Sequence, residues 1–430
     1  MTVAIALLVL LIVMFIGVPI PLAFLASSAY LVFVGDYDPA FLMPYGFSKT
    51  NSILLLTIPL FILAGSVMDK GGIGKKLIDT VEKLVGRVKG GLGVVTVVSC
   101  AIFGAISGSS SATLSCIGSI MSPRLKENGY EEGFIGALIA SSGVLGILIP
   151  PSMLMILFAW VGGQSVLASF LATLIPGIIL MVLFSIVNLV YAKRNPNIKL
   201  YDYSKKKEIN NSKKERGPLA ALLMPVIILG SIYGGILTPT EAAAVSVLYA
   251  VPVGILVYRE LNLRTFKETM ISAGKTTGVI MIMLFAVMIL SRLYIMENLP
   301  QLILSLLTSI SENKIVILIM VNLFMVVMGM LMDDCSGVLL VTPILLPVVT
   351  AIGVSPIHFA AIVGVNLGMG NITPPTAPLL YLAGRVADAE VKDMLKPTLA
   401  LIIFAWIPTL ILTTYVPQLS LFLPKLFGYI

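Results

Sequence analysis

The sequence predicts an all-α protein with many transmembrane helices. Hydrophobic residues make up 58% of the chain and charged residues only 11%, which is more apolar surface than a water-soluble core can bury. Apolar runs long enough to cross a bilayer recur from end to end, and none alternates as a membrane β-barrel strand does. The basic residues concentrate in one short segment between two apolar runs, so no nucleic acid partner is expected.

Two halves of the chain carry the same pattern at a constant offset of 224 residues. Chance identity among Leu, Ala and Gly is common in membrane segments, but three prolines coincide as well. They are Pro123, Pro150 and Pro151, with the counterparts Pro347, Pro374 and Pro375. This coincidence predicts an internal structural repeat.

Loop charges predict that the two halves are inverted relative to one another. Residues 69–89 carry six basic and three acidic side chains, whereas the equivalent residues 292–314 are neutral. Residues 258–275 carry a net charge of +2, whereas the equivalent residues 33–51 carry two acidic side chains and one basic. Because basic loops stay in the cytoplasm, equivalent loops lie on opposite sides of the membrane. The basic segment 192–217 is then cytoplasmic and both termini are outside.

Each half begins with scaffold helices in the same order. The first apolar run, 3–34, is too long for one crossing and has Pro19 and Pro21 near its middle, so it predicts two short crossings. Residues 218–257 are the equivalent pair. A longer span follows, at 52–67 or 277–296, and then an amphipathic arm, at 73–88 or 299–311, which we expect to brace the scaffold at the membrane interface.

An apolar segment in each half is too long for one straight span and has small polar residues at its centre. In residues 93–125 the centre is a serine and glycine cluster at 107–111, and in residues 315–350 it is an acidic cluster at 333–337. Each segment predicts a re-entrant hairpin, because irregular backbone at membrane depth is tolerated only against protein or a watery cavity. Helix packing through small residues is the alternative interpretation of the serine cluster.

The Pro-Pro pairs predict that the span after each hairpin is broken into two half-helices. Pro151 and Pro375 leave carbonyl groups one turn earlier without hydrogen bonds. These carbonyls and the oxygens of the facing tip form a cation site, and the opposing half-helix N-termini favour an anionic substrate. The first predicted site comprises Ser107, Gly108, Ser109, Ser110, Gly143 and Gly146, and the second comprises Asp333, Ser336, Gly337, Gly368, Gly370 and Thr373.

Substrate is expected near the midplane, between the two tips. The predicted contacts are Ser110, Ser111, Thr113, Asn366, Thr376 and Arg292. Carboxylates are costly at this depth, so Asp333 and Asp334 are functional candidates; one of the pair faces the site and the other caps a helix. Asp333 is assigned to the site. Arg292 is expected to snorkel to the interface, with contact to a substrate carboxylate as the alternative.

The pattern divides the chain into six segments. Residues 1–92 and 218–314 hold scaffold helices and the arms. Residues 93–163 and 315–387 each hold a hairpin and a broken helix, and together they form the transport domain. Residues 164–217 form a span and the basic linker, and residues 388–430 form a C-terminal span. The inverted repeat predicts that the transport domain slides against the scaffold as a unit.

The other polar residues in apolar segments have simpler roles. Cys100, Cys116 and Cys335 are expected to be buried thiols, since their odd number argues against a disulfide framework. His358 has no ligand partner at metal-binding spacing and is expected to be packed. Glu241 follows a proline at a helix start and predicts a cap.

Two other functions are compatible with parts of this pattern. An intramembrane aspartyl hydrolase could use Asp333 and Asp334, but adjacent carboxylates rarely converge on one water. A passive channel would need a lined pore rather than two half-depth hairpins. We therefore expect a coupled transporter and no enzymatic activity.

Several motifs resemble those of one family, the large membrane subunit of tripartite ATP-independent periplasmic (TRAP) transporters. The matching stretches are GGILTPTEAA at 234–243, ISGSS at 106–110, GSIM at 118–121, IPPS at 149–152, TPILLP at 342–347 and TPP at 373–375, together with Asn366. They are spread over essentially the whole chain.

The resemblance implies an elevator-type symporter in the bacterial inner membrane, driven by a Na⁺ gradient and importing an organic acid. It also implies two partners: a small membrane subunit of four helices and a soluble periplasmic substrate-binding protein. This chain has Thr113 where the family often has Asp, and Asp334 with Cys335 where it often has two Thr. The hydroxyl-rich first tip suits a polyhydroxylated acid such as sialic acid, and a C4-dicarboxylate is the alternative.

Overall fold

The computed structural model describes residues 2–85, 88–200 and 219–430. Every regular element in this part of the chain is a helix, which confirms the all-α prediction. Seven of the described helices are long and apolar enough to cross a membrane, and the bent pair Glu132–Leu148 and Met153–Gly162 would form an eighth span. Residues 201–217 of the predicted basic linker, and residues 86–87 of the first arm, lie outside the described residues.

The first half contains the predicted scaffold helices, hairpin and broken helix. The scaffold helices and arm are α1 (Thr2–Phe15), α2 (Ile20–Gly35), α3 (Leu42–Thr50), α4 (Thr57–Lys70) and α5 (Ile73–Val85). Hairpin 1 is α6 (Gly91–Ser107) with α7 (Ser110–Glu127), and the broken helix is α8 (Glu132–Gly143), α9 (Leu145–Leu148) and α10 (Met153–Gly162). The long span α11 (Val166–Arg194) completes the half.

The second half repeats this order. Its scaffold helices and arm are α13 (Leu219–Tyr233), α14 (Pro239–Pro252), α15 (Leu263–Met296) and α16 (Leu299–Ile310). Hairpin 2 is α17 (Lys314–Leu331) with α18 (Asp334–Ala351), and the broken helix is α19 (Pro356–Gly370) with α20 (Pro378–Ala387). The last helices are α21 (Val391–Leu401), α22 (Ile407–Tyr415) and α23 (Pro417–Leu426). Shifting α7 by the offset of 224 residues gives the bounds of α18.

Local chemistry explains where several of these helices begin and end. Pro19 precedes α2 and Pro21 lies in its first turn, where proline is tolerated because the backbone N–H groups of the first turn have no partner within the helix. Gly108, with φ of 63°, ends α6, and the side chain of Ser109 then caps α7 by accepting a hydrogen bond from Ala112 N. Glu241 forms a capping box at the start of α14, as predicted.

The third scaffold span of the second half is longer than predicted. A span was expected at residues 277–296, but α15 begins at Leu263, where the side chain of Asn262 accepts a hydrogen bond from Thr265 N. The added turns are polar, which suggested a loop, yet they contain no proline to end a helix. In the first half the equivalent stretch is divided between α3 and α4. The predicted C-terminal span is also divided, since α23 follows it as a separate helix.

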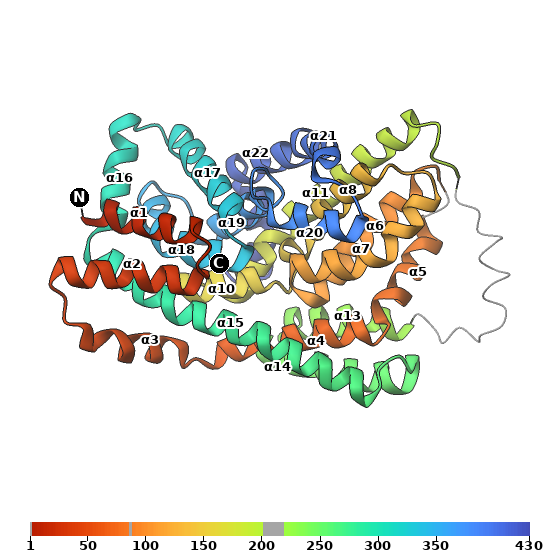
Figure 1. Cartoon of the computed structure of the whole chain (residues 1–430), viewed down its shortest axis with the longest axis horizontal. Helices are drawn as coiled ribbons and strands as arrows, with labels where there is room; N and C mark the ends of the chain where they lie inside the picture. The colour runs from red at the N-terminus through yellow and green to blue at the C-terminus, as the bar shows by residue number, and fades with distance from the viewer. Residues whose placement is uncertain (1, 86–87, 201–218) are drawn as a thin grey trace.

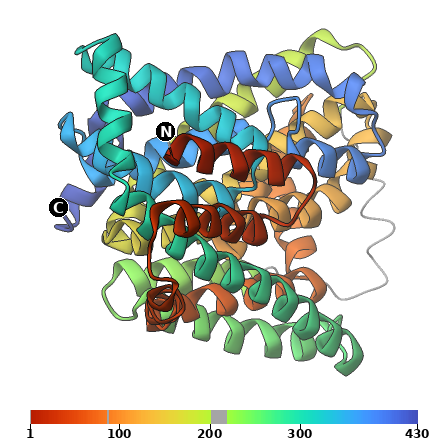
Figure 2. The same ribbon diagram turned by 60° about the vertical axis from the view of Figure 1, so that its left-hand side comes forward.

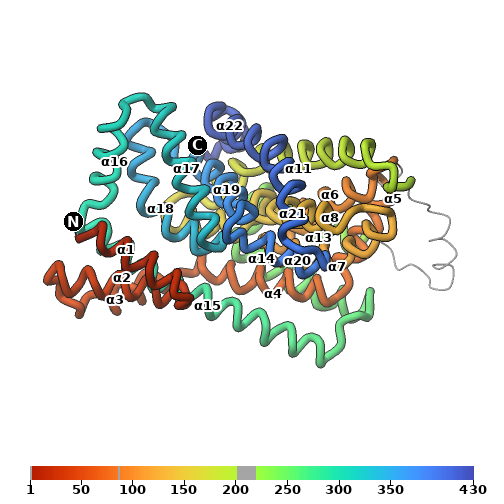
Figure 3. Tube along the Cα trace, turned by 45° about the horizontal axis from the view of Figure 1, so that its top comes forward, coloured from red at the N-terminus to blue at the C-terminus, as the bar shows by residue number. Residues whose placement is uncertain are grey.

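The scaffold and the hairpins occupy different sides of the molecule. In Figure 1, α2, α3, α4, α14 and α15 lie along the lower side, and most of the hairpin and broken-helix segments lie above them. Figure 2 shows α1 and α2, in red, side by side on the outer face. The two arms, α5 and α16, lie at opposite ends of the long axis in both Figure 1 and Figure 3. Equivalent elements at opposite ends are what an inverted repeat requires.

Candidate functional site

The tips of the two hairpins meet at equivalent positions of the repeat. Ser110 is the first residue of α7 and donates a hydrogen bond from its hydroxyl to the carboxylate of Asp334, the first residue of α18. The two residues are separated by the repeat offset, 224 positions. Contact between two equivalent residues is the geometry that a two-fold axis produces. The centre of the repeat therefore lies between the tips.

Asn371 brings the second broken helix to the same point. It follows the last residue of α19, and its side-chain Nδ2 donates a hydrogen bond to the other carboxylate oxygen of Asp334. Asp334 is 9% exposed, and Ser110 and Asn371 are each 1% exposed. The buried carboxylate of Asp334 thus links hairpin 2 to hairpin 1 and to the second broken helix through two uncharged hydrogen-bond donors. Asn371 was missed by the sequence analysis, although an amide just before the Pro-Pro break was a visible signal.

Asp333 lies outside this cluster, contrary to its assignment to the site. Its side chain is exposed and caps α18 by accepting hydrogen bonds from the backbone N–H groups of Cys335, at 3.1 Å, and Ser336, at 3.4 Å. The capping role therefore falls to Asp333 and the position between the tips to Asp334. Because one carboxylate is exposed and the other buried, the pair does not form the convergent dyad of a hydrolase. Cys335 is half-buried rather than buried as predicted.

The first predicted cation site is a cluster of neutral oxygens around the break in the first broken helix. Ser107 Oγ and Thr113 Oγ1 are 3.0 Å apart. A Cβ atom at Gly146 would lie 2.5 Å from Thr113 Oγ1 and 2.7 Å from the Ser109 carbonyl oxygen, so only glycine admits this approach. Carbonyl and hydroxyl oxygens in such an arrangement can solvate a small, hard cation.

The same cluster includes the backbone of Gly143, because a Cβ atom there would lie 3.3 Å from the Ser110 carbonyl oxygen. Across the described residues, no group of three or more His, Cys, Asp or Glu side chains is placed to hold a metal. His358 Nε2 instead lies 2.7 Å from the Thr413 carbonyl oxygen.

The residues of the second predicted cation site are less convergent. Thr373 donates its hydroxyl to the Met369 carbonyl oxygen at 2.6 Å, and Gly370 packs closely on Gly329 of hairpin 2. However, a Cβ atom at Gly337 would meet the side chain of Leu367, and one at Gly368 would meet the side chains of α9-flanking Val144 and of Trp406. These two glycines face apolar packing and not an oxygen cluster.

The predicted substrate contacts are spread over several places. Asn366 donates hydrogen bonds to Asn322 Oδ1 at 3.0 Å and to the Ile362 carbonyl at 2.8 Å. These bonds join helices to one another and do not involve the hairpin tips. Ser111 and Thr376 are exposed, whereas Thr113 is buried in the first oxygen cluster. Arg292 is exposed, and its Cζ atom lies 5.8 Å from the centre of the Tyr45 ring.

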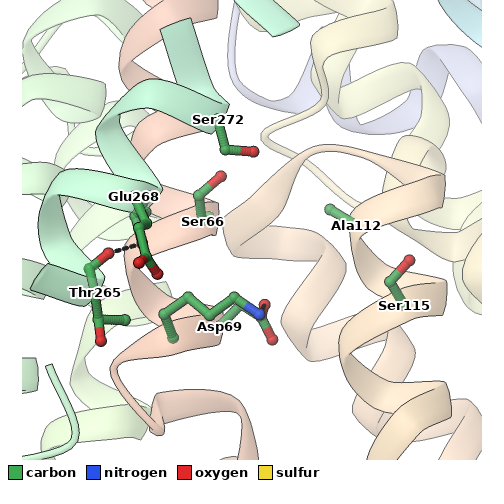
Figure 4. A pocket seen from close by; sticks show the side chains of 10 residues that line it. Ser66, Asp69, Ala112, Ser115, Thr265, Glu268 and Ser272 are labelled. Carbon is green, nitrogen blue, oxygen red and sulfur yellow. Dashed lines mark hydrogen bonds and ion pairs between the residues drawn. The ribbon is translucent and has the colours of Figure 1, made fainter. Parts of the chain in front are cut away.

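Two cavities separate the scaffold from the hairpins, one beside each hairpin. The hairpin-1 cavity, about 440 Å³, lies between α4, α7 and the start of α15. Figure 4 shows its lining, with Ser66 and Asp69 on α4 facing Ala112 and Ser115 on α7. The hairpin-2 cavity, about 420 Å³, lies between α3, α10, α18 and the end of α15.

The two cavities are equivalent and lie at opposite ends of the scaffold. Tyr45 lines the hairpin-2 cavity and Thr269, its counterpart at the repeat offset, lines the hairpin-1 cavity. Along α15 the nearest lining residues are Ser272 and Met288, which is a separation of about 24 Å in a helix. Since α15 is long enough to cross a membrane, the two cavities lie near opposite ends of a helix that could span it.

Known proteins similar to this chain identify its family. Residues 7–419 match the family model described as the tripartite ATP-independent periplasmic transporter, DctM component. A sialic acid TRAP transporter large permease from Vibrio cholerae is 32% identical, with 97% of each chain covered. A C4-dicarboxylate large permease from the same species is 35% identical, with 98% of each covered. An isethionate TRAP transporter permease from Oleidesulfovibrio alaskensis is 33% identical over 95% of this chain, which spans 64% of that protein's length.

A solved structure supports the fold. The YdaH transporter of Alcanivorax borkumensis superposes with a TM-score of 0.58 at 14% identity, covering 90% of this chain and 88% of that one. At that identity the likeness concerns architecture alone. Sequence and structure agree on the assignment. The chain belongs to the DctM component family, the large membrane subunits of TRAP transporters.

Proposed function

We propose that this chain is the subunit of a Na⁺-driven importer that carries an organic acid across the membrane by an elevator movement. The observation that carries the proposal is the junction at Asp334, where both hairpin tips and a broken helix meet. A binding site made of several elements is carried as a whole when those elements move together. Such a unit can face one cavity and then the other without being taken apart.

Neutral oxygen chemistry supports sodium as the coupling ion. The cluster of Ser107, Ser109, Thr113 and the glycine backbone at the break presents hydroxyl and carbonyl oxygens around one point. Hard monovalent cations are held by oxygens of this kind at broken helices. Asp334 adds a negative charge nearby, which favours cation entry and couples the occupancy of both hairpins.

The chemical class of the substrate is the best supported part of its identity. The similar permeases are named for isethionate, sialic acid, C4-dicarboxylates and 2,3-diketo-L-gulonate, which are all small organic acids. Their identities to this chain differ by no more than three percentage points, so similarity does not choose among them. Hydroxyls at the first tip favour a polyhydroxylated acid such as sialic acid, because they can form hydrogen bonds with the hydroxyls of the substrate.

The proposal includes two partners and a location. A small four-helix membrane subunit would complete the scaffold, and a soluble periplasmic protein would deliver the acid. The chain would reside in the bacterial inner membrane, with both termini periplasmic and the linker at 192–217 cytoplasmic, as the loop charges predict.

Reconstituted uptake tests this function. Proteoliposomes holding the chain with its small subunit would be given a labelled acid, its binding protein and either a Na⁺ or a K⁺ gradient. We expect uptake of at least one acid that requires both the Na⁺ gradient and the binding protein. Equal uptake in K⁺ would exclude sodium coupling, and uptake by the chain alone would exclude the tripartite arrangement.

A further inference from the structure

The hairpin-2 cavity carries positive charge without a balancing carboxylate. Lys49 lines it, and the Nζ atom of Lys49 lies 5.7 Å from the centre of the Tyr45 ring, which also lines it. Arg292 lies over the same ring at 5.8 Å. No acidic residue lines this cavity, and in the part of the chain that the structure describes neither cation forms an ion pair.

The nearest acidic residue along α15 is committed elsewhere. Glu297 follows the last residue of this helix, and its Oε1 accepts a hydrogen bond of 2.7 Å from the hydroxyl of Tyr37. It is not among the residues that line the cavity. Lys49 therefore faces the cavity with no carboxylate in its lining, and Arg292, which does not itself line the cavity, adds positive charge beside the Tyr45 ring.

A buried hydroxyl provides a second, independent indication of a ligand. Thr342 on α18 lines the hairpin-2 cavity and is 0% exposed, and its Oγ1 atom has no hydrogen-bond partner among the described residues. A buried hydroxyl without a partner is costly. Rotation of the Thr342 side chain toward the cavity would let this hydroxyl donate to an acceptor oxygen held there.

The equivalent cavity on the other side has the opposite character. Asp69 and Glu268 both line the hairpin-1 cavity, where the single basic residue is Lys70. Lys70 is engaged by Asp69, at 3.3 Å. The partner of Glu268, Arg264 at 3.1 Å, does not line the cavity. By lining residues alone, the hairpin-1 cavity thus has one carboxylate in excess, whereas the hairpin-2 cavity has one cation, Lys49, in excess.

We propose that the hairpin-2 cavity is a capture site for the carboxylate of an organic anion, with Lys49 and Thr342 as its ligands and Arg292 adding positive charge beside Tyr45, and that the hairpin-1 cavity repels the same group. The inference rests on the proposed import of an organic acid and adds where that acid is first held. Like charges in a low-dielectric cleft raise the local concentration of the opposite ion. Capture on the hairpin-2 side, which the loop charges place outside, would speed loading of the acid there, and the Na⁺ gradient would set the direction of net movement.

Charged thiol reagents measure this potential without knowledge of the substrate. Ile295→Cys places a thiol on the exposed lining of the hairpin-2 cavity, and Ser115→Cys places one in the hairpin-1 cavity. Val161→Cys is a second position in the hairpin-2 cavity. Each variant is made in full-length protein carrying Cys335→Ala. The rate of thiol modification is measured with two methanethiosulfonates, an anionic sulfonatoethyl and a cationic trimethylammonium reagent. Each rate is divided by the rate at which the same reagent modifies a free thiol in solution, which corrects for intrinsic reactivity.

The corrected ratio of anionic to cationic rate should be about tenfold higher at Ile295→Cys than at Ser115→Cys. Lys49→Gln or Arg292→Gln should each lower the ratio at Ile295→Cys by about threefold. Lys275→Gln removes the same charge elsewhere on α15 and should leave it unchanged. Similar ratios in the two cavities, or equal effects of Lys49→Gln and Lys275→Gln, would overturn the capture site even if Na⁺-driven uptake is observed. The expected ratios without uptake of any acid would instead overturn the proposed function.

Discussion

Hairpin 1 and hairpin 2 share a backbone arrangement but differ in chemistry. In each, a glycine of the first hairpin helix packs on a glycine of the facing broken helix: Gly104 on Gly146, and Gly329 on Gly370. At the tips, Ser110 occupies the position that Asp334 occupies in the other half. Close approach of two backbones needs glycine in both halves, whereas only one half needs a charge. The repeat therefore preserves geometry and divides the binding chemistry between its halves.

The two arms, α5 and α16, also differ in charge. Arg124 on α7 forms ion pairs with Glu82 and Asp79 of α5, at 2.7 and 3.2 Å, and Glu82 is 1% exposed. The second arm, α16, contains no charged residue. We expected both arms to brace the scaffold, but α5 is tied to hairpin 1 by buried charges. A crosslink between α5 and hairpin 1 would therefore join parts that are already attached.

Breaking the α5 ion pairs should give the largest loss of stability. Arg124→Met keeps the apolar stem but removes the cation shared by two largely buried carboxylates, at a cost of about 3 kcal/mol or more. Thermal unfolding of the purified protein in detergent measures the loss. Lys126→Gln is the matched control, because Lys126 pairs with Glu132 at the surface and should make no measurable difference. An equal effect of both substitutions would remove the distinction between the arms.

Removing the charge at the second tip should impair transport more than stability. Asp334→Asn keeps the shape of the side chain and removes its charge, and the weaker hydrogen bonds with Ser110 and Asn371 are offset because a carboxylate no longer has to be buried. We expect Na⁺-driven uptake to fall by about tenfold or more in protein that unfolds at nearly the same temperature. Asp333→Asn retains a good helix cap and should have the smaller effect on the Na⁺ dependence of uptake. A larger effect at Asp333 would return the site role to that residue.

Crowding the first oxygen cluster should shift the Na⁺ dependence of uptake at a modest cost in stability. The methyl group of Gly146→Ala would press on Thr113 and the Ser109 carbonyl, at a cost of about 1–3 kcal/mol. Na⁺ activation of uptake should shift to higher concentrations. Gly274→Ala is the control, since a Cβ atom there has nothing within 4 Å and helix propensity favours Ala. Unchanged Na⁺ activation in Gly146→Ala would show that the coupling sodium does not bind at this cluster.

The sequence located the hairpins and breaks because they interrupt apolar runs with residues of known effect. Gly108 ends α6 and the paired prolines end the first half of each broken helix, so local chemistry determined these boundaries. The choice between Asp333 and Asp334 could not be made in this way. Adjacent residues at a helix start point about 100° apart, and only the position of hairpin 1 decides which one meets a partner.

Charges in the arm illustrate what the sequence could not show. The arm at 73–88, which contains Glu82, was expected to be an interfacial amphipathic helix, and spacing gives no sign that Glu82 has a partner 42 residues away. The charges around the hairpin-2 cavity could not be predicted either, because Lys49 and Arg292 meet over Tyr45 only when α3 packs beside α15. Contacts between distant segments depend on the assembled fold and not on local pattern.

Movement of the hairpin unit against the scaffold is the central claim, and a reversible crosslink tests it most directly. Ser336 of hairpin 2 contacts Met283 of the scaffold, with 2.9 Å between Ser336 Oγ and Met283 Sδ. Met283→Cys with Ser336→Cys would join the two parts in protein lacking the native cysteines. Gly118→Cys with Val386→Cys is the control, since it joins hairpin 1 to α20 within the unit.

Uptake by the Met283→Cys and Ser336→Cys pair should stop on oxidation and return on reduction, whereas uptake by the control pair should persist when oxidised. Because Ser336 belongs to the second predicted cation site, Na⁺ binding is compared between the oxidised and reduced forms of the same pair, and it should be equal because the crosslink does not take the site apart. Continued uptake with the scaffold crosslink fully formed would contradict movement of the unit and would leave local opening at the tips as the transport step.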